Sequence, residues 1–284
     1  MTDTARLLAV SDLHVSYEAN RALVRDRLKP TSPGDWLIIA GDVGERVRDI
    51  SWALGLLAER FARVIWAPGN HELWTYDEGE AGGLRGVQRY EHVVEVCRSL
   101  GVLTPEDPYA VWTGVGGPVR IAPLFIGYDY SFLPPGTSTK QEALAYAHGT
   151  GVVCSDEFLL HPDPYPDRGA WCEDRLSLTA QRLRDCGTRI PLILVNHYPL
   201  VRRPVDVLRY PEFALWCGTT ATADWHRRFP VAAVIYGHLH IPRTTWHDGV
   251  RFEEVSLGYP REWQVRAKPP ALLREVLPSA VAAD

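Results

Sequence analysis

The amino-acid sequence predicts an α/β fold, and two observations support this prediction. Five short apolar runs, rich in β-branched or aromatic residues and each followed directly by a polar residue or a glycine, are typical of buried strands. They lie at residues 6–10, 35–40, 63–67, 191–195 and 231–236. Between them lie segments with apolar residues every three or four positions, which is the spacing of an amphipathic helix. Strands that alternate with helices in this way indicate an α/β protein.

Three helices and one hairpin are predicted between the strands. Residues 46–60 place Val47, Ile50, Leu54 and other apolar side chains on one helical face. Residues 84–100 repeat this spacing, with Gly101 as a plausible C-cap. A third helix is expected over residues 171–186. Residues 109–132 predict a hairpin or meander, with the glycine-rich "GVGGP" as turn material.

The length of 284 residues is compatible with one sizeable α/β domain or with two smaller ones. We expect a single domain over residues 1–276. Residues 133–170 are rich in Pro, Gly and aromatic residues and poor in periodicity, which predicts an inserted loop or lid. Residues 277–284 predict a disordered tail.

Composition excludes several classes of protein. A net charge of −5 argues against a general nucleic-acid binder, because such proteins carry a basic surplus. The five cysteines are odd in number and form no CxxC pair, so they indicate reduced thiols in a cytoplasmic protein. No apolar stretch reaches the roughly 18 residues of a membrane span. The apolar run at the N-terminus is too short for a signal peptide, and we expect no membrane association.

Polar side chains follow each of the five predicted strands at the point where the strand ends. They comprise five of the ten histidines, two aspartates and two asparagines. Ligands of open α/β sheets bind outside the carboxyl ends of the strands, so we expect these side chains to converge. In chain order, the residues are Asp12 and His14, then Asp42, then Asn70 and His71, then Asn196 and His197, then His238 and His240.

Taken singly, each motif has an ordinary structural explanation. The "GD" at Asp42 suits a tight turn, Asn70 suits a left-handed backbone, and His197 could be a hydrogen-bonded, half-buried histidine. Five coincidences at the same end of five strands instead indicate a metal site. Imidazole and carboxylate suit divalent Mn, Fe and Zn. The absence of cysteine among these candidate residues argues against a structural zinc cage.

The order of these motifs, D-x-H, G-D, G-N-H-E, N-H and G-H-x-H, resembles the calcineurin-like metallophosphoesterase superfamily. The resemblance implies a four-layer α/β/β/α sandwich of two mixed β-sheets flanked by helices. It also implies two divalent ions, with Mn and Fe expected and Zn or Mg possible. Asp42 would bridge them. The resemblance assigns Asp12, His14, Asp42 and His240 to one ion and Asp42, Asn70, His197 and His238 to the other.

The same resemblance implies a phosphodiesterase that works by attack of a metal-bound hydroxide. His71 would lie outside the metals and act on the substrate phosphate or the leaving group, so His71 and Asp42 are the expected catalytic residues. For substrate binding we add Asn70, His71 and Tyr198 together with Arg202 and Arg203, although both arginines also fit an ordinary solvated surface.

The C-terminal run "GHLHIPRTTWHDGVRFEEVSLGYPREW" is similar to a narrower group, the actinobacterial phosphopantetheinyl hydrolases. This similarity implies release of 4′-phosphopantetheine from an acyl carrier protein. Two alternatives stay open. One is a phosphodiesterase or phosphatase for small molecules such as cyclic nucleotides, and the other is a non-catalytic binding module. The sequence gives no oligomeric state.

Overall fold

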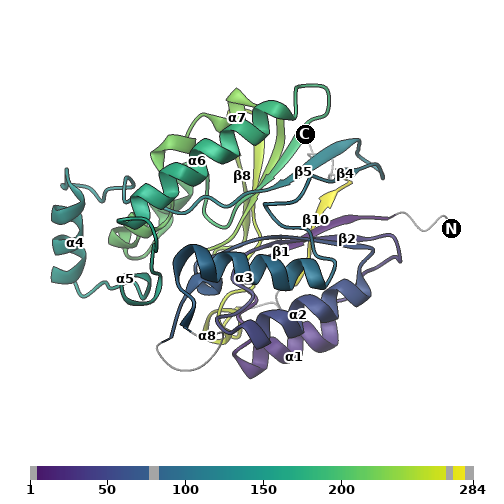
Figure 1. Cartoon of the computed structure of the whole chain (residues 1–284), viewed down its shortest axis with the longest axis horizontal. Helices are drawn as coiled ribbons and strands as arrows, with labels where there is room; N and C mark the ends of the chain where they lie inside the picture. Colours follow the sequence, from purple (N-terminus) through teal and green to yellow (C-terminus); the bar gives the residue numbers. More distant parts are fainter. Residues whose placement is uncertain (1–4, 77–82, 267–270, 279–284) are drawn as a thin grey trace.

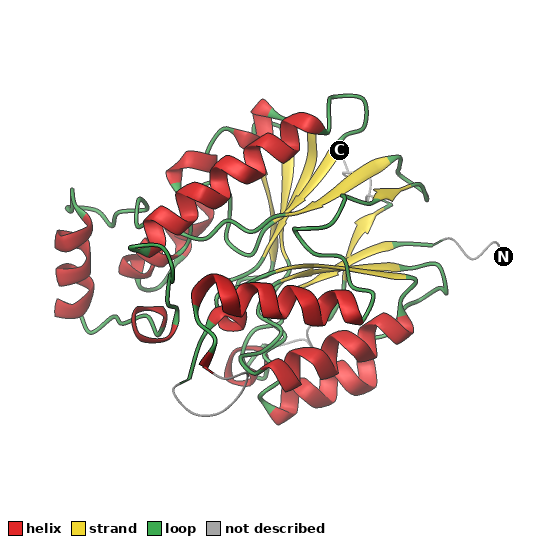
Figure 2. Ribbon diagram, in the orientation of Figure 1, coloured by secondary structure: helices red, strands yellow, loops and turns green. Residues whose placement is uncertain are grey.

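The computed structural model describes residues 5–76, 83–266 and 271–278. Two β-sheets pack face to face and helices cover both outer sides, which gives four layers (Figures 1 and 2). Helices α1, α2 and α3 lie against one sheet, and α6 and α7 lie against the other (Figure 1). This arrangement confirms the predicted α/β/β/α sandwich. Among the described residues, no helix is both long and apolar enough to cross a membrane.

The first sheet has four strands in the order β10-β1-β2-β3. Its strands β1, β2 and β3 run parallel, and β10 pairs antiparallel with β1. The strands are β1 (Leu7–Val10), β2 (Trp36–Ala40), β3 (Arg63–Ala67) and β10 (Arg274–Leu277). The covering helices are α1 (Glu18–Arg27), α2 (Val47–Arg60) and α3 (Gly86–Ser99).

The second sheet has six strands in the order β4-β5-β6-β7-β9-β8. The four inner strands are parallel, and the edge strands β4 and β8 are antiparallel to their neighbours, so both sheets are mixed. The strands are β4 (Val111–Trp112), β5 (Val119–Pro123), β6 (Leu192–Val195), β7 (Val231–Tyr236), β8 (Arg243–His247) and β9 (Val250–Glu254). The remaining α-helices are α4 (Lys140–Gly149), α5 (Asp156–Leu159), α6 (Arg168–Asp185), α7 (Trp225–Arg228) and α8 (Pro260–Trp263).

Burial on both faces explains why the strands are continuous apolar runs. In β2, Leu37 and Ile39 pack among the residues that face α1, α2 and α3. Their neighbours Ile38 and Ala40 point the other way, into the layer between the sheets. A strand whose two faces both meet protein has no position that favours a polar side chain.

Several boundaries differ from the predictions. Helix α6 begins at Arg168 rather than at residue 171, because the side chain of Asp167 caps it by accepting from the amide of Ala170. The predicted meander over 109–132 is limited to the β4–β5 pair, which ends at Pro123.

The segment 133–170, predicted as an inserted loop or lid, contains the helices α4 and α5 and the first residues of α6. Both helices project from one end of the sandwich, beyond the edges of the sheets (Figure 1). At the C-terminus, β10 extends to the buried Leu277, one residue into the predicted tail. Residues 279–284 of that tail lie outside the described residues.

Candidate metal centre

The seven predicted metal ligands meet at the carboxyl ends of strands from both sheets. Six of the seven are buried, and His240 is half-buried. One potential ligand atom each from Asp12, His14 and His240 lies within 4.8 Å of the others. A second group of the same kind joins Asp12, Asp42 and His197. Residues that are up to 228 positions apart in the chain therefore share one small volume.

The backbone at these positions adopts an uncommon conformation. Seven non-glycine residues in the described part of the chain have a positive φ angle, and five of them are predicted ligands. Such backbone costs free energy and persists only where the surroundings impose it. The ligands concerned are Asp12 (φ 53°), His14 (41°), Asp42 (54°), His238 (70°) and His240 (54°).

Two glycines in the motifs are needed for close approach. A Cβ atom on Gly69 would overlap the Asp42 carboxylate, and one on Gly237 would overlap the side chains of Ser11 and Asp12. Any other residue would push apart the strand exits that carry the ligands.

The first cluster of ligand atoms surrounds the Nε2 atoms of two histidines. His14 Nε2 and His240 Nε2 are 3.3 Å apart, and Asp12 Oδ1 lies 3.0 Å from His240 Nε2. Asp42 Oδ2 lies 3.9 Å from His14 Nε2. The Nδ1 atom of His240 donates to Glu262 Oε2 at 2.7 Å, which leaves its Nε2 as an electron-pair donor. These atoms fit ligands directed at one cation.

The second cluster is centred on His197. Its Nε2 lies 3.1 Å from Asn70 Oδ1, 3.4 Å from Asp42 Oδ2 and 3.2 Å from His238 Nδ1. Its Nδ1 donates to the carbonyl oxygen of Ala40 at 2.9 Å, so Nε2 is the ring nitrogen that is left to bind a cation. Asp42 Oδ2 is near both clusters, which is the position of a bridging ligand.

The electrostatics of both clusters favour positive charge. Burial lowers the pKa of His197, but the carboxylates of Asp42 and Asp12 and the hydrogen bond to Ala40 together outweigh burial and raise the pKa to about 10. Burial also lowers the pKa of His240, and Asp12 and Glu262 together outweigh burial and raise it to about 10. At His238, burial and the charge on His197 lower the pKa to about 3. Carboxylates, imidazoles and one amide oxygen, without a thiolate, form a donor set that suits Mn, Fe or Zn.

His71 lies beside the clusters rather than inside them. Its Nδ1 is 2.9 Å from Glu45 Oε1, and its Nε2 is 3.7 Å from Asp42 Oδ2 and 3.4 Å from the hydroxyl of Tyr259. The ring of Trp74 stacks on it at a centroid distance of 3.7 Å. Burial lowers the pKa of His71, but Asp42 and Glu45 together outweigh burial and raise it. A protonated His71 is therefore favoured.

Several carboxylates near the ligands were missed by sequence reasoning. Asp156, from α5, accepts hydrogen bonds from the Asn70 amide at 2.9 Å and from Trp74 Nε1 at 2.6 Å. Glu45 and Glu262 hold the Nδ1 atoms of His71 and His240. Their partners come from distant parts of the chain, so no local spacing pattern marked them.

Glu72, the last residue of the G-N-H-E motif, connects two loops instead of binding a metal. Its carboxylate accepts from the amides of Asp42, Val43 and Gly69 at 3.0, 2.7 and 2.9 Å. Burial and the nearby Asp42 charge raise its pKa to about 7. The loops that follow β2 and β3 are thereby tied together.

The predicted substrate-binding residues fall into two groups. Asn70 and His71 lie at the centre, and the buried Tyr198 packs its ring against His197 and His238. The two arginines lie elsewhere. Arg202 pairs with Asp206 at 3.2 Å and Arg203 is exposed, and neither lines the cleft at the metal ligands.

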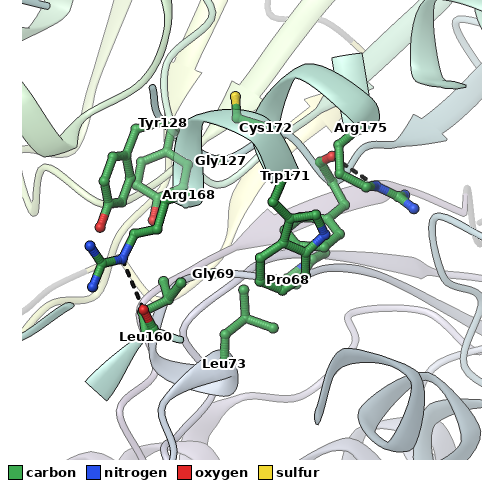
Figure 3. A pocket seen from close by; sticks show the side chains of 12 residues that line it. Pro68, Gly69, Leu73, Gly127, Tyr128, Leu160, Arg168, Trp171, Cys172 and Arg175 are labelled. Atoms are coloured by element: carbon green, nitrogen blue, oxygen red, sulfur yellow. Dashed lines mark hydrogen bonds between the residues drawn. The ribbon is translucent and has the colours of Figure 1, made fainter. Parts of the chain in front are cut away.

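An open cleft of about 410 Å³ adjoins the centre. Its floor contains Asp42, Asn70, His71, His238 and His240. Figure 3 shows a different cavity, lined by Pro68, Leu73 and Trp171 under α6. That cavity holds about 30 Å³, which is room for about one water molecule. Of these two cavities, the larger cleft is the one that is lined by the predicted ligands.

Comparison with known proteins agrees with this geometry. Residues 5–242 match the calcineurin-like phosphoesterase family. The [acyl-carrier-protein] phosphodiesterase PptH of Mycobacterium tuberculosis is 56% identical over 272 residues, which cover 96% of this chain and 83% of that protein. A crystal structure of phosphopantetheinyl hydrolase (PptH) from the same organism matches with a TM-score of 0.95 and 54% identity, covering 98% of each chain. The chain therefore belongs to the calcineurin-like phosphoesterase family and is a metal-dependent phosphoester hydrolase.

Proposed function

We propose that this chain is a dinuclear phosphodiesterase that releases 4′-phosphopantetheine from the serine of an acyl carrier protein. The observation that carries the proposal is the 56% identity, over 96% of the chain, with the M. tuberculosis acyl-carrier-protein phosphodiesterase. The clusters of potential ligand atoms support it, because four of the seven proposed ligands, Asp42, Asn70, His238 and His240, line a cleft that is large enough for a substrate.

Asp12, His14, Asp42 and His240 would hold one ion, and Asp42, Asn70, His197 and His238 the other. Mn and Fe fit this donor set, and Zn or Mg could also be used. Bound there, two divalent ions supply positive charge that stabilises the phosphoryl oxygens and lowers the pKa of water.

His71 is proposed as the general acid. In the hydrolysis, a P–O bond forms to water, which gives up a proton to solvent. The bond between phosphorus and the serine oxygen breaks, that oxygen takes a proton from His71 Nε2, and solvent protonates His71 again. Glu45, 2.9 Å from Nδ1, stabilises the protonated ring and fixes its orientation. The stacked Trp74 keeps the ring from turning away from Asp42. The products are the unmodified carrier serine and 4′-phosphopantetheine.

We further infer a cytoplasmic location, which the five free cysteines support. Neither nucleic acid nor membrane is proposed as a partner. The substrate partner is the carrier protein, and the oligomeric state is left open.

Intact-mass spectrometry of a holo acyl carrier protein tests the proposal. Incubation with the enzyme and Mn²⁺ should remove the mass of 4′-phosphopantetheine, while EDTA or the Asp42→Asn variant should prevent the loss. Hydrolysis of an aryl phosphodiester with no change in the carrier would instead favour a small-molecule phosphodiesterase. If neither substrate is hydrolysed, the chain is a binding module.

A further inference from the structure

One wall of the cleft is apolar, and its residues come from two segments outside the strand exits. Val153 precedes α5, while Leu208, Tyr210 and Phe213 belong to the stretch between β6 and α7. We call these four residues the apolar wall. The cleft is also lined by Tyr259, Arg261 and Glu262 from the α8 region.

The apolar wall is open to solvent at its outer end and touches the metal centre at its inner end. Val153 and Tyr210 are each 55% exposed. The ring of Phe213 stacks on His238, with centroids 5.7 Å apart and an angle of 18° between the planes. Exposed apolar side chains next to a catalytic centre are typical of a surface that contacts a ligand.

The wall is fixed relative to the centre by buried contacts. Beneath it, Ala143 and Ala147 of α4 pack with Leu215 and Trp216 in a separate apolar cluster. Glu157 of α5 accepts from Trp216 Nε1 at 2.8 Å, and its neighbour Asp156 accepts from Asn70. A wall held in this way is preformed, so a ligand does not need to order it on binding.

The position of His71 decides which half of a phosphodiester faces the wall. If His71 Nε2 protonates the serine oxygen, that oxygen lies on the side of Tyr259, whose hydroxyl is 3.4 Å from Nε2. The second ester group would then lie on the side away from His71, and the same cleft offers it His238 with Phe213 stacked on that ring. In the proposed substrate this group is the pantetheine arm, whose phosphate is followed by one CH₂ and then by a carbon with two methyl groups.

We propose that the apolar wall is the subsite for the pantetheine arm, with the two methyl groups of the arm against Phe213 and its later part along Leu208, Val153 and Tyr210. This inference rests on the proposed function. It adds a specificity-determining surface, because inorganic phosphate and simple phosphodiesters lack an arm that could contact the wall.

Inhibition by product tests this subsite without a carrier protein. Hydrolysis of bis(p-nitrophenyl) phosphate by the Mn²⁺-loaded enzyme serves as the reporter reaction, with free 4′-phosphopantetheine and inorganic phosphate as competing inhibitors. In the unsubstituted enzyme, 4′-phosphopantetheine should bind at least about tenfold more tightly than phosphate, because it alone reaches the wall.

Val153→Asp and Tyr210→Asp should each weaken inhibition by 4′-phosphopantetheine about tenfold and change inhibition by phosphate about twofold at most. Phe158→Asp and Val207→Asp are the matched controls. Phe158 is 66% exposed and Val207 51% exposed in the same two segments, but neither lines the cleft. Both controls should leave both inhibition constants unchanged.

Two results would overturn the subsite. In the first, 4′-phosphopantetheine inhibits the unsubstituted enzyme no better than phosphate does. In the second, the wall variants and the control variants weaken inhibition by 4′-phosphopantetheine equally. Failure of the proposed function has a separate signature. There, the unsubstituted enzyme hydrolyses the aryl diester but leaves a holo carrier protein intact, whatever the inhibition constants show.

Discussion

Asp156 accepts a hydrogen bond from the side-chain nitrogen of Asn70 at 2.9 Å, and this contact determines which way the Asn70 amide points. With the nitrogen held by Asp156, the oxygen faces His197 Nε2 at 3.1 Å. A residue from the segment that projects beyond the sheets therefore orients a proposed ligand of the second ion.

We predict that Asp156→Ala lowers Mn²⁺ affinity at the second site about 10- to 100-fold, which is the usual effect of losing a partner that orients a ligand. Asp156→Asn keeps an acceptor oxygen for Asn70, so the loss of Mn²⁺ affinity should be much smaller. Titration calorimetry with Mn²⁺ measures the difference. If both variants fold, as judged by circular dichroism, and bind the metal equally well, the orienting role is wrong.

His71→Ala should retain both metal ions but lose about 10²- to 10⁴-fold in turnover of a phosphodiester, because a positioned acid is removed. Metal analysis of the purified variant, alongside kcat, checks both parts. An unchanged kcat would contradict the role of general acid.

Glu45→Gln should also lower kcat, because Glu45 acts through His71. In the His71→Ala background the same change should have little further effect, since residues that act as a unit are not additive. A double-mutant cycle on kcat measures this coupling. If the losses in kcat of the two single variants add in the double variant, Glu45 does not act through His71.

Removal of metal should both inactivate and destabilise the protein. Without cations, the only positive charge that the described residues place beside the buried carboxylates of Asp12 and Asp42 is on protonated neighbouring histidines, in addition to hydrogen bonds from Ser11, Ser256 and backbone amides. At a Mn²⁺ concentration of about 100 times the dissociation constant, the expected stabilisation is about 2.7 kcal/mol per site. Thermal unfolding with EDTA and then with increasing Mn²⁺ should show this rise, and a constant Tm would contradict it.

Glu106 gives a pH-dependent stability term away from the metal centre. Burial raises the pKa of its carboxyl, but Arg175 at 2.7 Å, the hydroxyl of Tyr90 and the charge on Arg182 together outweigh burial and lower the pKa below 4.5. Since the folded state binds this proton more weakly, the stabilisation is complete above about pH 4.5 and is lost as the pH falls further. The difference in free energy of unfolding between the unsubstituted protein and Glu106→Gln should therefore shrink on acidification. A difference that is independent of pH would exclude the ion pair as its source.

The sequence predicted the five core strands to within about one residue because both faces of each strand are buried. It failed where burial is partial. In α1 only Asn20 and Val24 are buried, and the edge strand β8 has exposed alternate residues, so neither shows a clear apolar pattern. The strand β10 is short, and its pairing with β1 is set by tertiary structure.

The structure brings together the residues that the sequence marked by motifs at strand exits, and their role as metal ligands stays a prediction. Sequence reasoning could not find Asp156, whose role depends on how α5 packs against the loop after β3. It also could not place Arg202 and Arg203, because a position a few residues after His197 does not fix the direction of a side chain.

Five proposed ligands have a left-handed backbone, which lowers the stability of the fold at the place where activity needs their side chains. They are Asp12, His14, Asp42, His238 and His240. Glycine adopts positive φ without the penalty that a side chain carries. His14→Gly would relieve the backbone at that position, but it would also remove a fully buried ring that packs on His71 and Tyr259, and it should abolish catalysis. The side chains at these five positions are therefore explained by the reaction that they serve and not by the stability of the fold.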